Sequence, residues 1–363
     1  MLKRIVFTGG GSAGHVVPNL ELIQNFLKKG WEVFYIGSEA GVEKTLVSQR
    51  GIPYQAIASG KLRRYFSWQN FIDPFRILLG IVQAYIHLHK IKPRILFSKG
   101  GFVAFPVVFA AWLHKIPIVA HESDLTPGLA NKLSFPFASK ICLTFPEAKD
   151  FFKTQEKLVV TGTPIRETLL QGDRKEGITL CGFTSEKPCL MVIGGGSGSA
   201  RLNHVLRQAL LALLDDFNII HLCGVGKIEP ALADLNGYKQ FEYVDQKIEH
   251  LFAASDLIVS RSGANSVYEI LSLKKPHLFV PLPSKASRGE QIKNAEFFVE
   301  RGLSQCIFEE NLNPETLIQI VTRIWANHDK IKQKLANYPV HSGTATITQL
   351  IETIVTEESN RTQ

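Results

Sequence analysis

The chain has 363 residues, of which 45% are hydrophobic, and its formal net charge is +8. Because one hydrophobic core rarely grows past roughly 250–300 residues, a chain of this length is expected to fold as two domains. The longest apolar run, Phe102–Leu113, is shorter than the ~20 residues that a membrane-spanning helix needs, so the sequence argues against an integral membrane protein.

The positive charge is concentrated in the first part of the chain. Residues 1–160 contain 20 Lys and Arg against 10 Asp and Glu, whereas residues 161–363 contain 21 against 23. A field of this sign attracts phosphates, nucleic acid or an anionic membrane surface.

From the N-terminus onward, strand-like runs alternate with amphipathic helical stretches, which is typical of parallel sheets wound with helices. In the first half, strands are predicted at Arg4–Thr8, Glu32–Ile36, Arg94–Phe97, Ile116–Ala120 and Lys140–Leu143. Residues 161–187 are rich in Gly, Thr and charge and lack a sustained apolar period, so they are predicted to form a linker.

A second winding begins at residue 188 with a strand, a glycine loop and a helix start. Further strands are predicted at Ile219–Cys223, Gln240–Tyr243, Leu257–Ser260 and His277–Val280. A terminal helix near Thr344–Val355 ends in a polar tail that we expect to fray. The predicted fold is α/β, with two similar domains (1–160 and 188–340) facing a cleft, the linker 161–187, and a C-terminal helix and tail at 341–363.

The first glycine loop, "FTGGGSAGHV", contains a complete Gly-x-Gly-x-x-Gly at Gly9, Gly11 and Gly14. A dinucleotide site also needs an acidic residue at the end of the second strand to bind the ribose. The first acid there is Glu39, three residues beyond the predicted strand end, so the match to a dinucleotide fingerprint is poor. The simpler alternative is a tight strand-to-helix turn without a ligand.

His15 directly follows the last glycine of this loop. A helix N-terminus with unsatisfied N–H groups favours an anion and disfavours a cationic imidazole, so a neutral His15 that accepts a proton is a candidate base. The alternative is a histidine that only makes structural hydrogen bonds.

Three further motifs follow predicted strands. The loop Gly194–Ser199, followed by Ala200 and Arg201, repeats the strand, glycine loop and helix plan, and two such loops favour two phosphate-bearing ligands. "SKGGF" at 98–102 offers Lys99 as a phosphate contact, although it is also compatible with a plain turn. In "SRSGANSVYEI", Glu269 is a candidate for binding ribose hydroxyls, or else a solvated surface acid.

Residues 60–94 combine basic and apolar residues at helical spacing. The pattern fits a helix packed on the core and equally a helix that docks on an anionic membrane surface. Its cations are Lys61, Arg63, Arg64, Arg76, Lys90, Lys92 and Arg94, and its periodic apolar residues are Phe71, Ile72, Phe75, Leu78, Leu79 and Val82.

No metal site is predicted. His87 and His89 are two residues apart, which directs them to different faces of a helix. The five cysteines are scattered without a Cys-x-x-Cys pair, and no signal-peptide pattern opens the chain. We therefore expect a cytosolic protein without disulfides or zinc.

Taken together and in order, seven segments resemble the lipid II-forming enzymes of glycosyltransferase family 28. They are "GGSAGHVVPN", "SKGGFVAFP", "HESDLTPGLAN", "GTPIR", "GGGSGSARLN", "SRSGANSVYE" and "SRGEQIKNA", and the resemblance extends from Ile5 to about Ala336. It implies a GT-B fold of two Rossmann-like domains facing a cleft. It also implies an inverting, metal-independent transfer of N-acetylglucosamine from UDP-N-acetylglucosamine to lipid I, the undecaprenyl-diphosphate-linked muramoyl peptide, without a cofactor.

The same resemblance implies roles for individual residues. In the C-terminal domain, the backbone at Val244 would bind the uracil and Glu269 the ribose. Ser197 and Arg166 would hold phosphate oxygens, and Gln291 would contact the sugar. His15 is the candidate base.

Further site residues come from the other matched segments. The donor-binding set includes Ser12, Ala13 and Gly14 near the reacting centre, and Asp124 and Asn131 as sugar contacts, with Asp124 standing where asparagine is frequent in the family. The acceptor diphosphate would meet Gly10, Gly11, Lys99, Gly100 and Gly101.

The implied partners are UDP-N-acetylglucosamine, lipid I, an anionic membrane at its cytoplasmic face and proteins of cell-wall synthesis, without nucleic acid. Three alternatives stay open at this point. A diacylglycerol sugar transferase would share the fold but use an acceptor without a diphosphate. A non-catalytic UDP-sugar sensor would not need His15, and a nicotinamide dehydrogenase would need the missing ribose acid.

Overall fold

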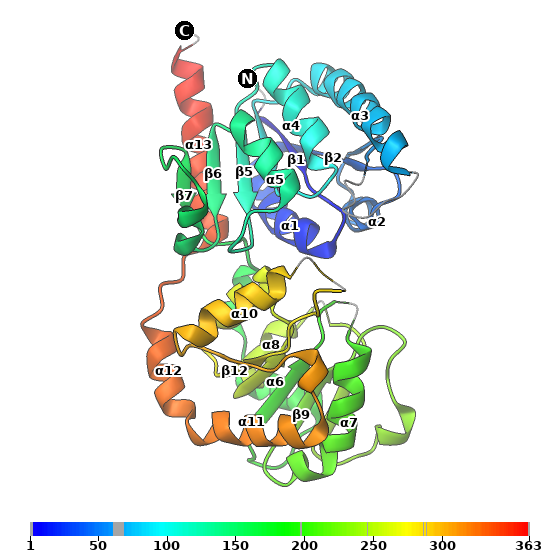
Figure 1. Ribbon diagram of the computed structural model, residues 1–363, viewed down its shortest axis with the longest axis vertical. Coiled ribbons are helices and arrows are strands. Elements are labelled where there is room, and N and C mark those ends of the chain that lie inside the picture. The colour runs from blue at the N-terminus through cyan, green and yellow to red at the C-terminus, as the bar shows by residue number, and fades with distance from the viewer. Residues whose placement is uncertain are drawn as a thin grey trace. The chain divides into compact units, whose positions relative to one another are not determined.

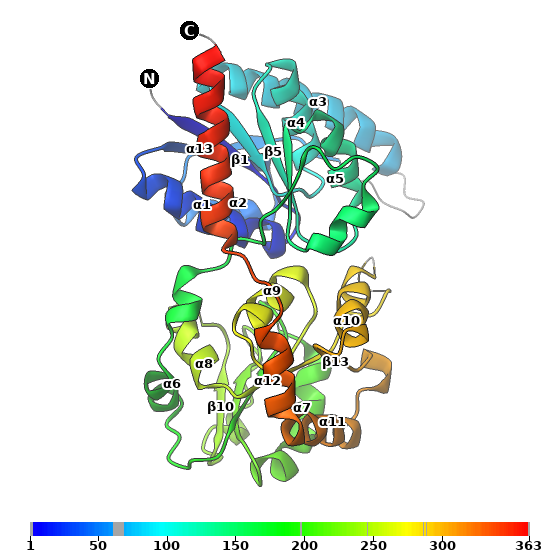
Figure 2. The same ribbon diagram turned by 90° about the vertical axis from the view of Figure 1, so that its left-hand side faces the viewer.

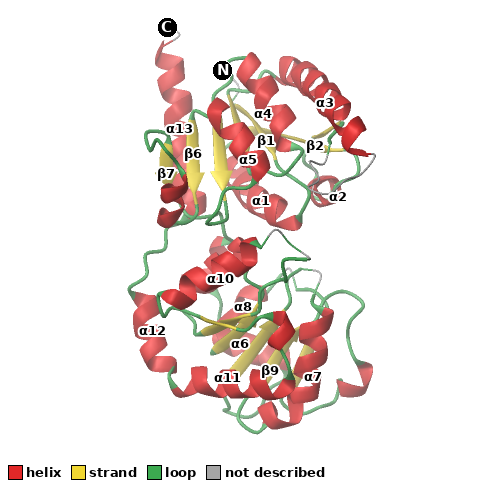
Figure 3. Cartoon of the chain, viewed as in Figure 1, coloured by secondary structure: helices red, strands yellow, loops and turns green. Residues whose placement is uncertain are grey.

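The computed structural model describes residues 3–60, 69–196, 198–244, 246–285, 287 and 289–361. The chain divides into two compact units, Met1–Ile165 with His341–Gln363, and Arg166–Val340. Figure 1 labels the elements of each unit. In Figure 3 the strands of each unit form a central layer with helices against it.

The first unit is built on a seven-stranded parallel sheet in the order β3-β2-β1-β4-β5-β6-β7. Its inner strands are nearly continuous apolar runs, as expected for strands that helices cover on both faces. The strands are β1 (Arg4–Thr8), β2 (Glu32–Ser38), β3 (Tyr54–Ile57), β4 (Ile95–Ser98), β5 (Ile118–Glu122), β6 (Lys140–Leu143) and β7 (Leu158–Val160). The helices are α1 (Ala13–Lys28), α2 (Val42–Ser48), α3 (Gln69–Ile91), α4 (Ala104–Leu113), α5 (Leu129–Ser134) and α13 (Gly343–Arg361).

The C-terminal helix α13 belongs to the first unit, and Figure 2 shows it, in red, beside α1. Ile347, Ile351 and Val355, spaced four residues apart, enter the core that α1 also lines. Asn25 donates to Thr348 over 2.9 Å. The helix continues to Arg361, so it extends beyond the predicted end at Val355.

The second unit contains a six-stranded parallel sheet in the order β10-β9-β8-β11-β12-β13. The strands are β8 (Cys189–Ile193), β9 (Asn218–Leu222), β10 (Tyr238–Phe241), β11 (Leu257–Ser260), β12 (His277–Phe279) and β13 (Gln305–Cys306). The helices are α6 (Arg174–Cys181), α7 (Ala200–Leu214), α8 (Ile248–Ala254), α9 (Ala264–Ser272), α10 (Glu290–Glu300), α11 (Pro314–Ala326) and α12 (His328–Ala336).

The predicted linker 161–187 is not a linker throughout. Residues 174–181 form α6, which packs closely on α8. The two helices approach so closely at Gly177 that an added Cβ would lie 2.0 Å from the His250 carbonyl oxygen. The glycine at this close contact interrupts the apolar period that would have identified the helix. Residues 161–165 belong to the first unit and 166–187 to the second.

Each sheet has one switch point, where neighbouring strands are connected in opposite directions. It lies between β1 and β4 in the first unit and between β8 and β11 in the second. Ligands of open α/β sheets bind outside the carboxyl ends of the strands at such points. The loops at these ends are 9–12 and 99–103, and 194–199 and 261–263, which contain the predicted glycine motifs.

Candidate functional site

The two loops at the switch point of the first unit interlock through their backbones. The N–H of Gly10 donates to the Gly100 carbonyl over 3.2 Å, and the Tyr35 hydroxyl donates to the Gly9 carbonyl over 2.7 Å. Gly101 has a φ of +86°, and a Cβ there would lie 2.1 Å from the Gly10 carbonyl oxygen. Only glycine therefore permits this contact.

Two N–H groups that were expected to face the acceptor diphosphate are used inside the protein. Gly10 donates to Gly100, and Gly11 donates to the Glu43 carboxylate over 3.2 Å. The exposed residues of this loop run from Gly11 through Ser12 and Ala13 to Gly14, at the N-terminus of α1. A helix N-terminus of this kind suits an anionic ligand.

His15 lies in the first turn of α1 and is half-buried. Its Nδ1 is 3.0 Å from the Gly10 carbonyl oxygen and 3.2 Å from the Ser12 hydroxyl. Because a carbonyl oxygen can only accept, Nδ1 carries the proton in this arrangement. In the neutral ring the lone pair is then on Nε2, the nitrogen that could accept a proton from a substrate.

The side chain of Lys99, which the sequence predicted to contact phosphate, points into the interior of the first unit. Its side chain is 0% exposed, and its ammonium donates to His121 Nδ1 over 2.8 Å and to the Thr163 hydroxyl over 2.9 Å. Nε2 of His121 donates to the Gly162 carbonyl over 3.0 Å. Lys99 thus joins β5 to the segment after β7 and does not present its charge at the surface.

Burial lowers the pKa of Lys99 from 10.5 to about 7, although the carboxylates of Glu122 and Asp124 oppose the shift. Burial, followed by the nearby charge of Lys99, lowers the pKa of His121 well below 6.5. His121 is therefore a neutral acceptor for Lys99 at neutral pH.

This burial predicts a pH-dependent stability. Between pH 7 and about 10.5 the unfolded chain binds more protons at Lys99 than the folded one. The free energy of unfolding therefore rises with pH in this range. We expect the free energy of unfolding of the wild type, minus that of Lys99→Met, to rise by about 3 kcal/mol from pH 7 to pH 10. Urea unfolding at several pH values measures it. The exposed Lys132→Met is the control, and a difference that stays constant with pH would contradict the prediction.

Asn131 and Asp124, predicted as sugar contacts, belong to a loop that Glu122 organises. The buried carboxylate of Glu122 accepts from Asn131 Nδ2 over 2.9 Å and from the Asp124 N–H over 3.1 Å. Asn131 is buried against Gly100, where an added Cβ would lie 2.3 Å from its Oδ1. In this structure Asn131 therefore shapes the loop and does not face outward.

In the second unit, the glycine loop is fixed to neighbouring strands. Gly198 has a φ of +69°, and a Cβ there would lie 2.0 Å from the Cys223 carbonyl oxygen. Ser199, the N-cap of α7, accepts from Leu202 N over 3.3 Å and from Arg261 over 2.6 Å. Ser197 lies outside the described residues.

The other predicted donor contacts of the second unit lie on several different elements. Gln291 accepts from the Leu282 N–H over 3.1 Å, and its Nε2 lies near Gly263, the N-cap of α9. Glu269 is half-buried in the second turn of α9. Val244, in the loop after β10, and Arg166, before the short helix at 167–171, are half-buried as well.

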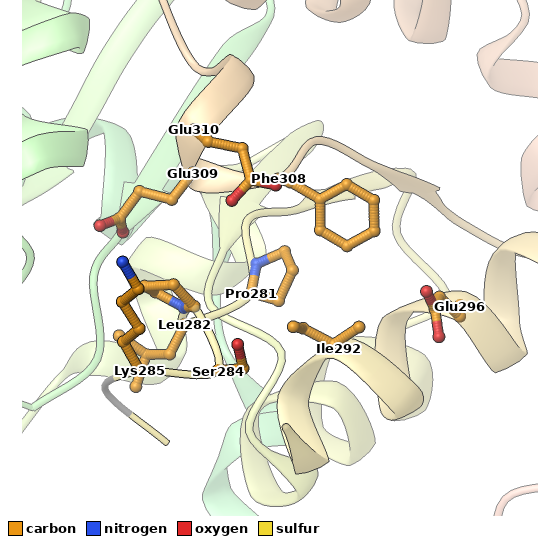
Figure 4. Close-up of a pocket in the computed structure, with 10 residues that line it drawn as sticks. Pro281, Leu282, Ser284, Lys285, Ile292, Glu296, Phe308, Glu309 and Glu310 are labelled. Atoms are coloured by element: carbon orange, nitrogen blue, oxygen red, sulfur yellow. The ribbon is translucent and has the colours of Figure 1, made fainter. Parts of the chain in front are cut away.

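A pocket of about 340 Å³ lies beside the loop that follows β12. Figure 4 shows Phe308, Ile292 and Pro281 around it, with Glu309 and Lys285 on one side. Glu309 also pairs with Arg261, which connects the pocket to the glycine loop through Ser199. None of the described donor-binding residues that the sequence predicts lines this pocket.

Within the described part of the chain, no three His, Cys, Asp or Glu side chains are grouped so as to hold a metal ion. The described helices also include none that is both long and apolar enough to cross a membrane.

Sequence reasoning missed four buried groups that organise these loops: Glu43, His121, Glu122 and Arg261. Three of them occupy the last two positions of a strand or the position directly after it, at the carboxyl edge of the sheet, and this placement was a usable signal. Glu43 lies in the first turn of α2, and nothing in its sequence neighbourhood indicates that it reaches the glycine loop.

Comparison with known proteins gives concordant matches over nearly the whole chain. The glycosyltransferase family 28 N-terminal domain matches residues 5–143, and the glycosyltransferase family 28 C-terminal domain matches residues 189–354. A relative in Legionella pneumophila (strain Paris) is 53% identical over 352 residues, covering 97% of each chain. A relative in Clostridium tetani is 49% identical and covers 97% of this chain and 98% of its own.

Both relatives are named UDP-N-acetylglucosamine–N-acetylmuramyl-(pentapeptide) pyrophosphoryl-undecaprenol N-acetylglucosamine transferase. Among solved structures, MurG of Acinetobacter baumannii is 26% identical, with a TM-score of 0.78 over 97% of this chain and 99% of that one. The pair of Rossmann-like units corresponds to the GT-B fold, which confirms the fold class predicted from the sequence.

Proposed function

The chain belongs to glycosyltransferase family 28, and on this basis we propose that it transfers N-acetylglucosamine from UDP-N-acetylglucosamine to lipid I, yielding lipid II. The observation that carries the proposal is full-length similarity: relatives named for this transfer share about half of the sequence over 97% of the chain. The first unit would bind the acceptor and the second the UDP-sugar.

The residues of the first unit suit the proton transfer that this reaction needs. The attacking sugar hydroxyl of the acceptor must lose its proton as its oxygen bonds to the anomeric carbon, while the bond from that carbon to UDP breaks. His15, with Nδ1 held by Gly10, offers the Nε2 lone pair as the base. The exposed N-terminus of α1 at Ser12–Gly14 would attract the acceptor diphosphate.

The residues of the second unit suit a departing nucleoside diphosphate. The N-terminus of α7 follows the glycine loop, and the positive end of a helix stabilises developing negative charge. Ser197 and Arg166 would bind phosphate oxygens, Glu269 the ribose, Val244 the uracil and Gln291 the sugar. We propose that this arrangement performs an inverting transfer without a metal ion.

The test of this proposal is the transfer of labelled N-acetylglucosamine to a short-chain lipid I analogue, with EDTA present and a diacylglycerol acceptor in parallel. We expect transfer to the lipid I analogue alone, at the same rate with the chelator. Transfer to diacylglycerol would overturn the assigned acceptor. UDP-sugar binding without any transfer would overturn the enzymatic function, and inhibition by EDTA would overturn metal independence.

The exposed face of α3 supports docking of the protein on a membrane surface, which we propose to be the cytoplasmic one. Apolar side chains recur there at helical spacing and face outward, unlike those of a helix packed only on a core: Phe75, Leu78, Leu79, Val82 and Ile86. Phe75 is 73% exposed, and Arg76 is exposed beside it. Arg63 and Arg64, which the sequence assigned to the same surface, lie outside the described residues.

We expect the double substitution Phe75→Ser and Leu78→Ser to weaken binding to anionic phospholipid vesicles by roughly tenfold or more, since it removes apolar area that would enter the interface. Co-sedimentation with vesicles measures the effect. Leu211→Ser on α7 is the matched control, because Leu211 is 76% exposed in the other unit. Equal vesicle binding by all three proteins would refute α3 as the docking surface.

A further inference from the structure

One peptide group of the first glycine loop lies between a buried carboxylate and the proposed base. The Gly10 carbonyl oxygen is 3.0 Å from His15 Nδ1, and the Gly11 N–H donates to Glu43 Oε2 over 3.2 Å. The carbonyl of Gly10 and the N–H of Gly11 belong to the same amide. Glu43, this amide and His15 therefore form a continuous hydrogen-bonded chain.

Glu43 is held rigidly at the far end of that chain. It is 0% exposed, and its Oε1 accepts from the Ser38 N–H over 3.2 Å and from the Ser38 hydroxyl over 2.5 Å. Cβ atoms at Gly10 and Gly41 would lie 2.5 Å and 2.2 Å from the carboxylate, so both glycines are needed for its approach. Both carboxylate oxygens accept hydrogen bonds, which fixes the orientation of the carboxyl group.

We propose that Glu43 is a positioning residue for His15 that acts through the Gly10–Gly11 peptide group. A carboxylate that accepts the amide N–H polarises the amide, which makes its carbonyl oxygen a stronger acceptor for the Nδ1 proton of His15. This fixes the ring orientation and the Nδ1–H tautomer, and it increases the basicity of Nε2. The peptide group thus orients the imidazole ring and fixes its tautomer, as a directly bonded carboxylate does in other acid–base pairs.

The other titratable groups around this chain do not supply the same effect. Burial, with a smaller contribution from Glu43, raises the pKa of both Tyr35 and Tyr54 above the usual tyrosine range, so both stay neutral. Lys99 packs on Gly9 through its Cβ, but its ammonium donates to His121 and Thr163. Among these groups, Glu43 is the one bonded to the Gly10–Gly11 amide.

The role of Glu43 in catalysis rests on the proposed function, whereas its effect on the His15 ring can be measured without turnover. The test compares Glu43→Gln with Ser38→Ala. Glu43→Gln keeps the shape of the side chain but removes its charge, whereas Ser38→Ala removes a different partner of the same carboxylate and leaves the chain to His15 intact. We expect Glu43→Gln to lower kcat by roughly 10- to 100-fold with unchanged KM for the UDP-sugar, and Ser38→Ala to stay near the wild-type rate.

The second readout is the nitrogen NMR spectrum of ¹⁵N-histidine-labelled protein, in which the His15 signals are identified by their loss in His15→Gln. We expect the Nδ1–H tautomer in the wild type and in Ser38→Ala, and a larger share of the Nε2–H tautomer in Glu43→Gln. An unchanged tautomer in Glu43→Gln would overturn the inference, and so would equal losses of kcat in both variants. A wild type that shows the expected tautomers but transfers no sugar would overturn the proposed function alone.

Discussion

His15→Ala is expected to lower kcat for transfer to a lipid I analogue by about 10²- to 10⁴-fold, because it removes the group that accepts the proton of the attacking hydroxyl. The affinity for UDP-N-acetylglucosamine should stay unchanged, since the residues proposed to bind the nucleotide belong to the second unit. Single-turnover kinetics measure the chemical step, and calorimetry with UDP measures donor binding.

The matched control is His114→Ala. His114 is another half-buried histidine of the first unit, where it stacks on Tyr85 with ring centroids 3.9 Å apart. We expect its removal to leave the chemical step unchanged in a detergent-solubilised assay. If His15→Ala retained most of the wild-type single-turnover rate, another group would have to be the base.

Most of the fold was predictable because the central strands are strongly apolar and separated by amphipathic helices. The strands that the sequence analysis missed are β3, β7 and β13. Each lies at or near an edge of its sheet, has two to four residues and is at least partly exposed. Such short strands lack enough buried positions to create a recognisable period.

The candidate site was predictable at the level of loops but not of individual atoms. The glycine motifs correctly identified the loops at both switch points. Whether an N–H faces a ligand or a protein acceptor depends on residues far away in sequence, such as Glu43 for Gly11 and Gly100 for Gly10. A lysine directly after a strand suggests a phosphate contact, but the sequence does not reveal the direction of its side chain. The side chain of Lys99 turns inward to His121.

Gly198→Ala is expected to damage the glycine loop of the second unit more than any other single methyl group added there. Its φ of +69° is unfavourable for alanine, and the new Cβ would overlap the Cys223 carbonyl oxygen, which is backbone and cannot rotate away. The strained backbone alone costs about 1–3 kcal/mol, and relief of the overlap requires the loop to leave β9. The N-terminus of α7 would then be displaced, so we expect UDP to bind at least roughly tenfold more weakly.

Gly196→Ala in the same loop is the control. Apart from its two chain neighbours, the described residues place no heavy atom within 4 Å of a Cβ at Gly196, and its backbone does not adopt a positive φ. We therefore expect Gly196→Ala to unfold at the wild-type temperature, while Gly198→Ala unfolds at a lower one, by roughly 2–4 °C for each kcal/mol lost. Calorimetry of thermal unfolding and of UDP binding on both variants measures the two effects. Normal stability together with normal UDP affinity in Gly198→Ala would mean that the contact between this loop and β9 does not shape the donor site.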